Sequence, residues 1–417
     1  MKTYLCIDLK TFYASVECVE RGLDPFKTNL VVCDPSRGKG GICLAVSPKM
    51  KELGVKNRCR IFEIPKDIDY IVAIPRMKHY IEHSANIYQI YLKYISKDDI
   101  HVYSIDECFM DVTKYLKLYD MSAKELANMI ISDVYKSTGI SAACGIGSNL
   151  FLAKIALDIT AKHSKDLIGV LDEEEFKRTI WKHRPITDIW NIGRGIANRL
   201  EKYNVYDLEG VTKLDEKILY KEFGVNAEFL IDHAWGRETC TIKDIHNYRS
   251  KSNSITNGQI LFEDYKYEDA FLVLKEMVEV STLDLVDKHL VTNNIFLYVG
   301  YSKDVIKATG GSMKIDGFTN SHKKLKEYFI NLFERTTNKN HLIRRINIGF
   351  NNVIDEEFKT IDLFTNVEED EKERKIQEAI LDIKHKYGKN AILKGMNLQE
   401  KATTKTRNKL IGGHNGE

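Results

Sequence analysis

The stretch that decides the fold is Val102-Tyr103-Ser104-Ile105-Asp106-Glu107-Cys108-Phe109-Met110, an apolar run that holds two acids. A second apolar run, Tyr4-Leu5-Cys6-Ile7, leads directly into Asp8. Carboxylates in strand-like apolar segments are costly to desolvate unless a cation neutralises them, and a divalent metal is the usual cation. Each acid alone is more typical of a turn or a cap. The three acids together predict a metal site suited to phosphate chemistry.

Hydrophobic spacing around these acids predicts a β-α-β-β-α-β unit. Residues 3–9 have the pattern of a buried strand, and a helix with apolar residues at a 3.6-residue period follows. Long helices are predicted near 76–96 and 122–138, on either side of the hairpin that carries the acidic pair. A strand from residue 141 and a helix over 149–162 complete the unit, which is typical of a ferredoxin-like domain.

Two motifs add a resemblance to a known family. The sequence closely resembles the palm motifs of Y-family translesion DNA polymerases at Ile7-Asp8-Leu9-Lys10-Thr11-Phe12-Tyr13-Ala14-Ser15-Val16-Glu17 and at Tyr103-Ser104-Ile105-Asp106-Glu107-Cys108-Phe109-Met110-Asp111. Order and spacing agree from residue 1 to about residue 365. The branch that it resembles most is the bacterial SOS-mutagenesis branch, which contains the catalytic subunit of DNA polymerase V and its Gram-positive relatives.

The resemblance implies an α+β multidomain fold, a right-hand polymerase with a ferredoxin-like palm, small fingers, a helical helix-hairpin-helix thumb and an α+β little finger. It places the palm at 1–12 and 75–173, the fingers at 13–74, the thumb at 174–243, a linker at 244–252, the little finger at 253–354 and a tail at 355–417. Independently, alternating strands and helices beyond the linker predict a second small α+β domain.

The function implied by the resemblance is template-directed, low-fidelity DNA synthesis across damaged template. The reaction is a two-metal transfer of nucleotides from dNTPs to the primer 3′-hydroxyl of primer-template DNA. Asp8 and Asp106 would bridge two Mg²⁺ ions, for which Mn²⁺ can substitute. Glu107 would bind the catalytic ion, and the carbonyl of Leu9 would complete the nucleotide-side ion. Lys10 stands where many family members carry an acid, so it is not expected to be a ligand.

The resemblance assigns six residues to nucleotide binding: Phe12, Tyr13, Ile42, Leu44, Lys51 and Lys162. Tyr13 aligns with the steric gate that excludes a 2′-hydroxyl, and Phe12 flanks it. From the residues alone, an ordinary core aromatic explains Tyr13 equally well. Ile42 and Leu44 align with the roof over the nascent base pair. Lys51 and Lys162 would hold the triphosphate, Lys51 as a point charge where other branches use arginine.

Seven residues are candidates for DNA binding: Ile192, Gly193, Gly195, Arg249, Lys251, Arg344 and Arg345. The glycines form a tight turn that enters a helix, and such a turn presents backbone N–H groups to phosphate. A plain helix hairpin with glycine for clearance is the alternative. The four basic residues lie in or just before the expected little finger, which, as the resemblance implies, should track phosphates without reading sequence. A solvated charged surface is the alternative for each of them.

A candidate partner peptide precedes the acidic run at 368–371. Ile361, Leu363 and Phe364 are apolar anchors on an otherwise charged segment, which fits a peptide that docks into a hydrophobic pocket. The segment resembles the pentapeptide with which bacterial polymerases hold the sliding clamp, although Thr360 replaces the usual glutamine. Local packing against the preceding domain is the alternative. Accessory subunits are further candidate partners, and no role is predicted for 365–417.

Composition bounds the classes of function without selecting one. The 417 residues include 62 basic and 60 acidic side chains, so the formal net charge of +2 gives no argument for nucleic-acid binding. The eight cysteines are never closer than ten residues apart, which excludes C-x-x-C motifs and indicates reduced thiols. The start of the chain has no apolar leader, and no run approaches the roughly 20 apolar residues of a membrane span. We therefore expect a cytoplasmic protein without a membrane partner.

Three other functions remain to be weighed. His79-Tyr80-Ile81-Glu82-His83 matches the H-x-x-E-H signature of a zinc protease, but the sequence shows no third ligand in a suitable context. A catalytically inactive, DNA-binding and clamp-associated scaffold is the main alternative, yet it would be expected to have lost part of the acidic trio. A cyclase would share the ferredoxin-like core and the metal-binding acids, but it has no use for a DNA-gripping thumb.

Overall fold

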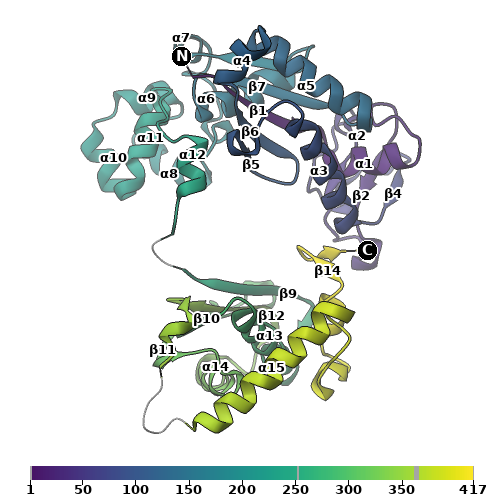
Figure 1. Cartoon of the computed structure of the whole chain (residues 1–417), viewed down its shortest axis with the longest axis vertical. Helices are drawn as coiled ribbons and strands as arrows, with labels where there is room; N and C mark the ends of the chain where they lie inside the picture. Colours follow the sequence, from purple (N-terminus) through teal and green to yellow (C-terminus); the bar gives the residue numbers. More distant parts are fainter. Residues whose placement is uncertain (1, 251–252, 361–365, 417) are drawn as a thin grey trace. The chain divides into compact units, whose positions relative to one another are not determined.

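The structure is a computed structural model that describes residues 2–250, 253–360 and 366–416. The chain divides into two compact units, drawn in Figure 1. The first consists of Met1–Tyr248 with His414–Glu417, and the second of Arg249–Gly413. In the described part of the chain, every helix is too short or too polar to cross a membrane.

A five-stranded sheet forms the centre of the first unit. Its order is β5-β6-β1-β7-β8, with neighbouring strands antiparallel except for the last pair. The strands are β1 (Tyr4–Leu9), β5 (Ile100–Val102), β6 (Glu107–Asp111), β7 (Ala142–Gly147) and β8 (Ile168–Leu171). The first four strands and their connecting helices follow the β-α-β-β-α-β order, which confirms the predicted ferredoxin-like unit.

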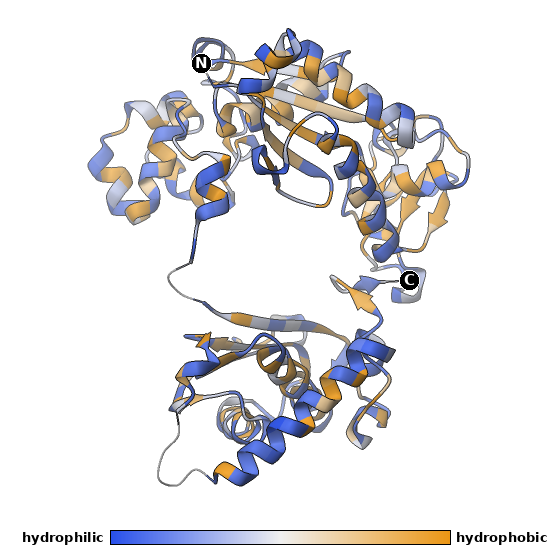
Figure 2. Ribbon diagram, in the orientation of Figure 1, coloured by the Kyte–Doolittle hydropathy of each residue, from blue (hydrophilic) through white to orange (hydrophobic). Residues whose placement is uncertain are grey.

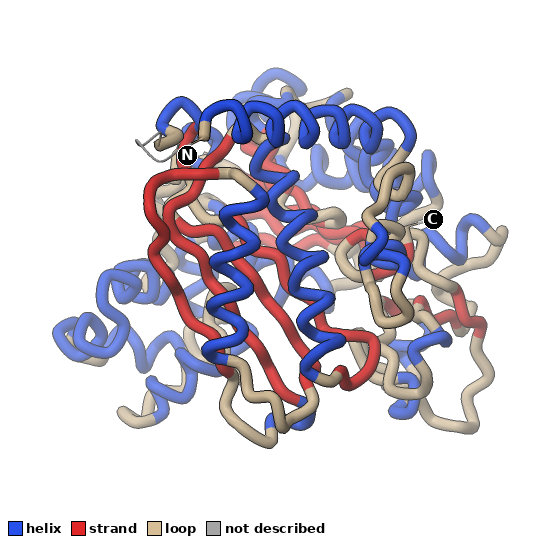
Figure 3. The backbone as a smooth tube through the Cα atoms, turned by 90° about the horizontal axis from the view of Figure 1, so that it is seen from below, coloured by secondary structure: helices blue, strands red, loops and turns tan. Residues whose placement is uncertain are grey.

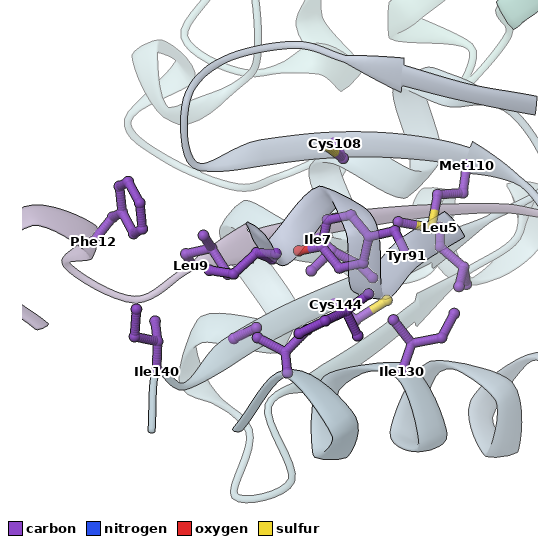
Figure 4. Close-up of a cluster of buried hydrophobic side chains, with 14 of the residues drawn as sticks. Leu5, Ile7, Leu9, Phe12, Tyr91, Cys108, Met110, Ile130, Ile140 and Cys144 are labelled. Carbon is purple, nitrogen blue, oxygen red and sulfur yellow. The ribbon is translucent and has the colours of Figure 1, made fainter. Parts of the chain in front are cut away.

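Helices cover both faces of this sheet. On one face, α3 (Met77–Leu92) and α5 (Ala123–Thr138) pack on alternate residues of β1, with Leu5, Ile7 and Leu9 buried among them (Figure 4). On the other face, α6 (Leu150–Ile155) packs on Tyr4 and Cys6, so both surfaces of β1 are buried. α6 continues as a π-helical segment, η4 (Ala156–Thr160).

Beside this sheet lies a smaller region of short elements. α1 (Phe12–Glu20) follows β1, and three strands pair in the order β3-β2-β4. The other elements of this region are β2 (Leu30–Val32), β3 (Ala45–Val46), α2 (Pro48–Glu52) and β4 (Ile71–Ala73), whereas α4 (Thr113–Tyr119) follows β6 and packs on the core of the larger sheet through Tyr115. Val31, Cys33, Cys43, Val46 and Met50 form a small separate core here. This core lets the region fold as a lobe of the first unit.

The rest of the first unit is helical, as the sequence predicts for 185–236. Its helices are α7 (Glu173–Thr179), α8 (Arg194–Glu201), α9 (Leu208–Lys213), α10 (Glu216–Phe223), α11 (Ala227–Ala234) and α12 (Ile242–Asn247). Their core includes Phe176, Leu200 and Leu219. The expected linker at 244–252 overlaps α12. The first residue of α12, Ile242, is buried against the β1–α6 core and attaches this helix to the first unit.

The second unit is also a sheet covered by helices. Its strand order is β11-β10-β12-β9, and α13 (Tyr267–Asp287) and α14 (His322–Thr336) cross one face (Figure 3). The strands are β9 (Ile255–Tyr265), β10 (Leu290–Tyr301), β11 (Thr309–Thr319), β12 (Ile343–Asn351) and the short β13 (Ile354–Asp355), which pairs with β10. Ile346, Ile348 and Phe350 of β12 face the helices, whereas Arg345 and Asn347 point away from them.

Most of the region that the sequence indicates to be a tail is folded onto the second unit. α15 (Val367–Tyr387) packs on α13 and is largely hydrophilic in Figure 2. Buried Glu276 of α13 accepts hydrogen bonds from Asn397 Nδ2 at 2.9 Å and from the Thr403 N–H at 2.7 Å. α16 (Thr404–Arg407) and β14 (Leu410–Ile411) follow in this unit, and β15 (His414–Asn415) belongs to the first unit. Because these partners are polar, hydrophobic spacing gave no sign of the packing.

Short 3-10 segments connect the larger elements. They are η1 (Pro35–Arg37), η2 (Ile61–Glu63), η3 (Lys97–Asp99), η5 (Ala161–His163), η6 (Ile186–Asp188), η7 (Gly224–Asn226), η8 (Ser302–Asp304), η9 (Glu356–Phe358) and η10 (Gly395–Leu398).

Candidate active site

The three acids predicted from the sequence lie at the ends of two neighbouring strands. Asp8 of β1 stands opposite Glu107 of β6 in the antiparallel register. The Leu9 N–H donates to the carbonyl of Asp106 at 2.9 Å, which holds the acidic pair next to the end of β1. The strand pairing therefore brings Asp8, Asp106 and Glu107 to one edge of the sheet.

A strained turn connects β1 to α1 beside these acids. Thr11 adopts a left-handed conformation with φ of 46°, which is uncommon for a β-branched residue. The Ser15 hydroxyl donates to the carbonyl of Lys10 at 2.6 Å and the Lys10 N–H donates to the carbonyl of Ser141 at 2.8 Å. These bonds fix the turn and start α1 directly after the strand. Such strained backbone is often found at functional sites.

Asp106 is held by its own hairpin. The Ser104 hydroxyl donates to Asp106 Oδ1 at 2.7 Å, and the Ser84 hydroxyl of α3 donates to the carbonyl of Ile105 at 2.6 Å. The Tyr103 N–H closes the hairpin by donating to the carbonyl of Glu107 at 2.9 Å. The position of the acidic pair is thus set by short local bonds and one contact from α3.

Lys154 of α6 neutralises Glu107. Its Nζ lies 2.8 Å from Oε1 and 2.9 Å from Oε2 of Glu107, and 3.0 Å from Oδ2 of Asp158. Only 8% of the Lys154 side chain and 10% of the Glu107 side chain are exposed. Burial opposes the charge of Lys154, but Glu107 and Asp158 outweigh it and raise the pKa of Lys154. Lys154 and Asp158 were not singled out from the sequence.

Lys162 plays the same part for Asp8. Its Nζ lies 2.7 Å from Asp8 Oδ2 and 2.8 Å from Asp158 Oδ1. The π-helical segment η4 lies between Lys154 and Lys162 and places Asp158 within reach of both. Single π-helical turns are frequent at functional sites. The two lysines and Asp158 form a chain of charges along the edge of the acidic cluster.

The acids remain short of positive charge in spite of these lysines. Burial raises the pKa of Asp8, although Lys162 opposes the shift, and Asp106 adds to it. Burial raises the pKa of Glu107 as well, against the effect of Lys154. A raised carboxyl pKa beside cations means that the negative charge is incompletely compensated. An additional cation would therefore be stabilised here.

The donor set fits a hard divalent cation, but its side chains are not drawn together into a closed cage. Carboxylate and carbonyl oxygens from Asp8, Asp106, Glu107 and Leu9 are the ligand type that such ions prefer. Among the described residues, one trio of candidate ligands has donor atoms that all lie within 4.8 Å of one another, and it is not this trio. The donor atoms of Asp8, Asp106 and Glu107 are therefore spread further apart. Glu107 and Asp8 would have to exchange lysine contacts for a metal.

Tyr13 stands on α1 next to the acids. Its ring stacks on the ring of Tyr80 with centroids 4.6 Å apart and planes inclined by 23°. Burial raises the pKa of Tyr13, and the nearby charge of Asp106 adds to the shift. Phe12 lies just past the end of β1 in Figure 4 and is buried in the hydrophobic core that also contains Leu9. Tyr13 is half-buried and Phe12 is a core residue.

The platform under Tyr13 is a buried ionic network. Tyr80 donates its hydroxyl to Glu17 Oε1 at 2.7 Å, and Arg76 donates to both carboxylate oxygens of Glu17 at 2.9 and 3.0 Å. Arg21 also pairs with Glu17. Burial raises the pKa of Glu17, but these hydrogen bonds outweigh it and hold the pKa below its ordinary value. The network fixes α1 against α3.

The other candidate nucleotide residues lie on the small lobe. Lys51 of α2 is close enough to Asp8 and Lys162 for their charges to act on it, and burial lowers the pKa of Lys51. Burial lowers the pKa of Lys10 as well, and Asp8 opposes that shift. The Ile42 side chain is 40% exposed, and Leu44 is half-buried beside the palm core. Lys10, Lys51 and Lys162 thus surround Asp8 with cations.

The candidate DNA-binding turn lies at the start of α8. Ile192 is buried in the helical core, so its side chain is not available for contact. Gly193 precedes the helix and Gly195 lies in its first turn. A Cβ at either glycine would meet no atom within 4 Å, so packing within the described chain does not demand glycine there. The glycines leave the backbone open to an external molecule.

In the second unit, two candidate DNA-binding residues lie on the outer face of the sheet or its rim. The Arg345 guanidinium lies 5.5 Å from the centre of the Tyr298 ring. Arg344 lies 3.6 Å from Asp264. Ile260 and Phe262 of β9, two residues not predicted from the sequence, are 67% and 52% exposed. Arg249 is the first residue of the second unit. Lys251 and the clamp candidates Ile361, Leu363 and Phe364 lie outside the described residues.

Comparisons with known proteins agree with this architecture. The family model described as "impB/mucB/samB family" matches residues 7–158, and the model of its C-terminal domain matches residues 252–363. The Bacillus subtilis (strain 168) protein named "Putative UV-damage repair protein UvrX" is 31% identical over 418 residues, which cover 99% of this chain and 97% of that protein. DNA polymerase IV 2 of Halalkalibacterium halodurans is 28% identical over 416 residues, with 99% of each chain covered.

A solved structure shows the same fold. The Y-family DNA polymerase chimera Dbh-Dpo4(243-245)-Dbh matches 85% of this chain and 99% of its own, with a TM-score of 0.65 at 22% identity. The chain belongs to the Y-family of translesion DNA polymerases, the impB/mucB/samB family. It is a DNA-directed DNA polymerase of the damage-bypass class, whose substrates are primer-template DNA and dNTPs and whose family uses divalent metal ions.

Proposed function

We propose that this chain copies damaged template with low fidelity, by two-metal transfer of a nucleotide from a dNTP to the primer 3′-hydroxyl. The observation that carries the proposal is the meeting of Asp8, Asp106 and Glu107 at paired strand ends, with their negative charge incompletely compensated. Asp8, Asp106, Glu107 and the carbonyl of Leu9 would hold two Mg²⁺ ions, or Mn²⁺. When bound, such ions acidify the attacking hydroxyl and neutralise charge on the triphosphate.

Lysines around Asp8 bind the triphosphate in this proposal. Lys162 pairs with Asp8 at 2.7 Å, and Lys10 and Lys51 lie within electrostatic range of Asp8. With a metal bound, Asp8 would no longer need Lys162 as its counter-ion, and Lys162 would then be available to contact phosphate. Lys162 can exchange a carboxylate partner for a phosphate partner because its ammonium is a point charge on a flexible stem.

The sugar and base of the incoming nucleotide lie between α1 and the small lobe. Tyr13 excludes a 2′-hydroxyl, and its stacking on Tyr80 keeps the ring from moving aside. Phe12 supports Tyr13 from the core, with ring centroids 5.8 Å apart. Ile42 and Leu44 cover the base pair. The exposure of Ile42, at 40%, supports its contact with a substrate.

We divide the chain into palm, fingers, thumb and little finger at the boundaries predicted from the sequence, except that all of α12 joins the first unit and the segment after residue 355 joins the second unit up to Gly413. The open backbone at Gly193 and Gly195 contacts DNA phosphates, with Ile192 anchoring the turn from the core. Arg249, Lys251, Arg344 and Arg345 give salt-dependent, sequence-independent affinity. Exposed Ile260 and Phe262 add apolar contact to the sugar faces of the backbone.

A sliding clamp is the proposed processivity partner, bound through Ile361, Leu363 and Phe364. The near-neutral charge of the chain supports a need for such a partner. Replacing Leu363 and Phe364 with alanine should abolish clamp-stimulated synthesis and leave clamp-free synthesis intact. Equal loss of both would place the peptide in the fold instead. Accessory subunits remain further candidates.

The test of the catalytic proposal is primer extension with four dNTPs and Mg²⁺ on intact and damaged templates. Asp106→Asn and Glu107→Gln keep the shape of the side chains and remove charge, and Asp111→Asn at the other end of β6 is the matched control. Extension by the parent and the control but not by the two site variants is the expected result. Equal extension by all four proteins would refute the site.

A further inference from the structure

A second group of ligand-type side chains lies away from the three acids, on the interface between α1 and α3. His79 and His83 are one helical turn apart on α3, so both imidazoles point to the same side of the helix. Their ring centroids are 4.6 Å apart and their planes are inclined by 76°. α1 packs beside α3, and its last residue is Glu20 (Figure 1).

Glu20 completes a three-residue set with these histidines. Its Oε1 lies 3.2 Å from His83 Nε2, and its Oε2 lies 3.3 Å from His79 Nε2. Two ligands of a tetrahedral zinc ion are about 3.3 Å apart when each bond is about 2.0 Å. Donor atoms from all three residues lie within 4.8 Å of one another, and no other such trio occurs among the described residues.

One nitrogen of this set lacks a hydrogen-bond partner. His79 Nε2 is buried and makes no hydrogen bond with the described residues, although Glu20 lies nearby. Its other nitrogen, Nδ1, is 3.8 Å from Glu82 Oε2. A carboxylate behind the non-ligating nitrogen is the usual way to orient a metal-binding histidine. A buried unpaired nitrogen aimed at two other donors therefore has the features of a metal ligand.

Nearby positive charge does not compete for the site. Arg76, one turn before His79, donates to both oxygens of Glu17 at 2.9 and 3.0 Å, and Arg21 also pairs with Glu17. Glu17 is completely buried and compensates these guanidinium groups. Glu20 is therefore left to interact with the histidines.

We propose that Glu20, His79 and His83 bind a divalent transition metal of the zinc type. Two imidazole nitrogens and one carboxylate favour zinc and its neighbours over magnesium, which prefers oxygen ligands alone. Glu82 acts as an orienting residue. The bound ion joins the end of α1 to α3, the two helices that carry the stacked rings of Tyr13 and Tyr80. The sequence displayed only the two histidines and Glu82; the fold supplies the third ligand from 59 residues earlier than His79.

The test is titration of the metal-free full chain with Zn²⁺ against a chromophoric chelator, in excess Mg²⁺ to occupy the other carboxylates. The parent should bind one equivalent of Zn²⁺. His83→Gln should weaken that binding by more than about tenfold, because even the loss of a residue that only orients a ligand weakens metal binding by about that factor. Glu20→Gln, a change of similar shape at an exposed position, should weaken it as well. His183→Gln is the matched control, because His183 is 26% exposed, against 19% for His83, and also lies close to a carboxylate, at 3.0 Å from Asp188.

Cobalt(II) substitution separates this site from the cysteines. Co²⁺ bound to nitrogen and oxygen ligands lacks the charge-transfer absorption of a cobalt–thiolate bond, so the parent spectrum should lack it too. Cys43→Ser should leave the spectrum and the zinc affinity unchanged. Failure of the parent to bind zinc, equal zinc binding by the parent and both site variants, or a thiolate spectrum that Cys43→Ser removes would each overturn the proposal.

Discussion

Replacing Lys154 with methionine should expose how closely the acids depend on a counter-ion. Methionine keeps the length and apolar stem of lysine but leaves Glu107 and Asp158 without their contacts at 2.8 and 3.0 Å. Removing one partner of a buried ion pair costs about 3–5 kcal/mol because the other charge stays buried. With 8% and 10% side-chain exposure, the Lys154–Glu107 pair belongs to this class.

The expected effect is a lower unfolding midpoint of the first unit. At about 2–4 °C for each kcal/mol in a unit of this size, the midpoint should fall by about 6–20 °C in metal-free buffer. Trp181, Trp190 and Trp235 are the only tryptophans and all lie in the first unit, so their fluorescence reports on that unit alone. Millimolar Mg²⁺ should recover more of the midpoint in the variant than in the parent, because the ion replaces the missing charge.

Lys93→Met is the matched control for this prediction. Lys93 pairs with Asp133 at 3.2 Å, but 56% of its side chain is exposed. Surface pairs contribute about 0–1 kcal/mol, so the control should melt close to the parent. A Lys154→Met protein that melts like this control, or that gains no more from Mg²⁺ than the parent does, would refute the argument that Lys154 stands in for a metal.

Three further predictions concern other parts of the chain. Tyr13→Ala should raise ribonucleotide incorporation relative to deoxyribonucleotide by about a hundredfold, equivalent to about 2.7 kcal/mol, while Tyr13→Phe keeps the ring and the discrimination; unchanged selection in the alanine variant removes Tyr13 as the gate. Glu276→Ala leaves the donors of Asn397 and Thr403 unpaired, so the C-terminal segment should become about 3 kcal/mol less protected in hydrogen exchange, and unaltered exchange would contradict this. Burial lowers the pKa of His322 from 6.5 to about 4, so the second unit should lose up to about 3 kcal/mol as the pH falls from 6.5 to 4. His322→Leu should flatten that loss in urea melts, and a parallel loss in both proteins would show that other groups titrate.

Much of the catalytic unit could be predicted because its signals are local. Periodic apolar residues predict β1, α3 and α5, and acids at the ends of apolar runs predict the site at Asp8 and the Asp106–Glu107 pair. Strand order then brings the acids together without further information. The resemblance of two motifs to Y-family polymerases agrees with the family matches over residues 7–158 and 252–363.

Lys154 shows why other site residues were missed. Every residue of α6 is buried, and an apolar helix that contains one lysine implies a buried acid as its partner. That signal was present in Leu150-Phe151-Leu152-Ala153-Lys154-Ile155, but the identity of the acid depends on packing across 47 residues. The π-helical segment that aligns Asp158 with two lysines has no comparable sequence signature.

Long-range polar packing hid the remaining features. Glu276 meets Asn397 and Thr403 across 121 and 127 residues, and neither partner is apolar. Periodicity detects only the apolar face of a helix, so the folding of the C-terminal segment onto α13 left no trace in the pattern. The same reason explains why Glu20 was not connected with His79 and His83.

Alternate residues of β1 face two different environments, so the position of the Asp8 carboxylate depends on the number of residues in this strand. Leu5, Ile7 and Leu9 face one core, whereas Cys6 and Asp8 face the lysines of α6 and its continuation. Deleting or inserting one residue within β1 would exchange these sets, sending the carboxylate into hydrocarbon and a leucine into the ionic cluster. Evolution can therefore vary the size of these side chains more easily than their number. The length of this strand is therefore constrained by the different environments on its two faces.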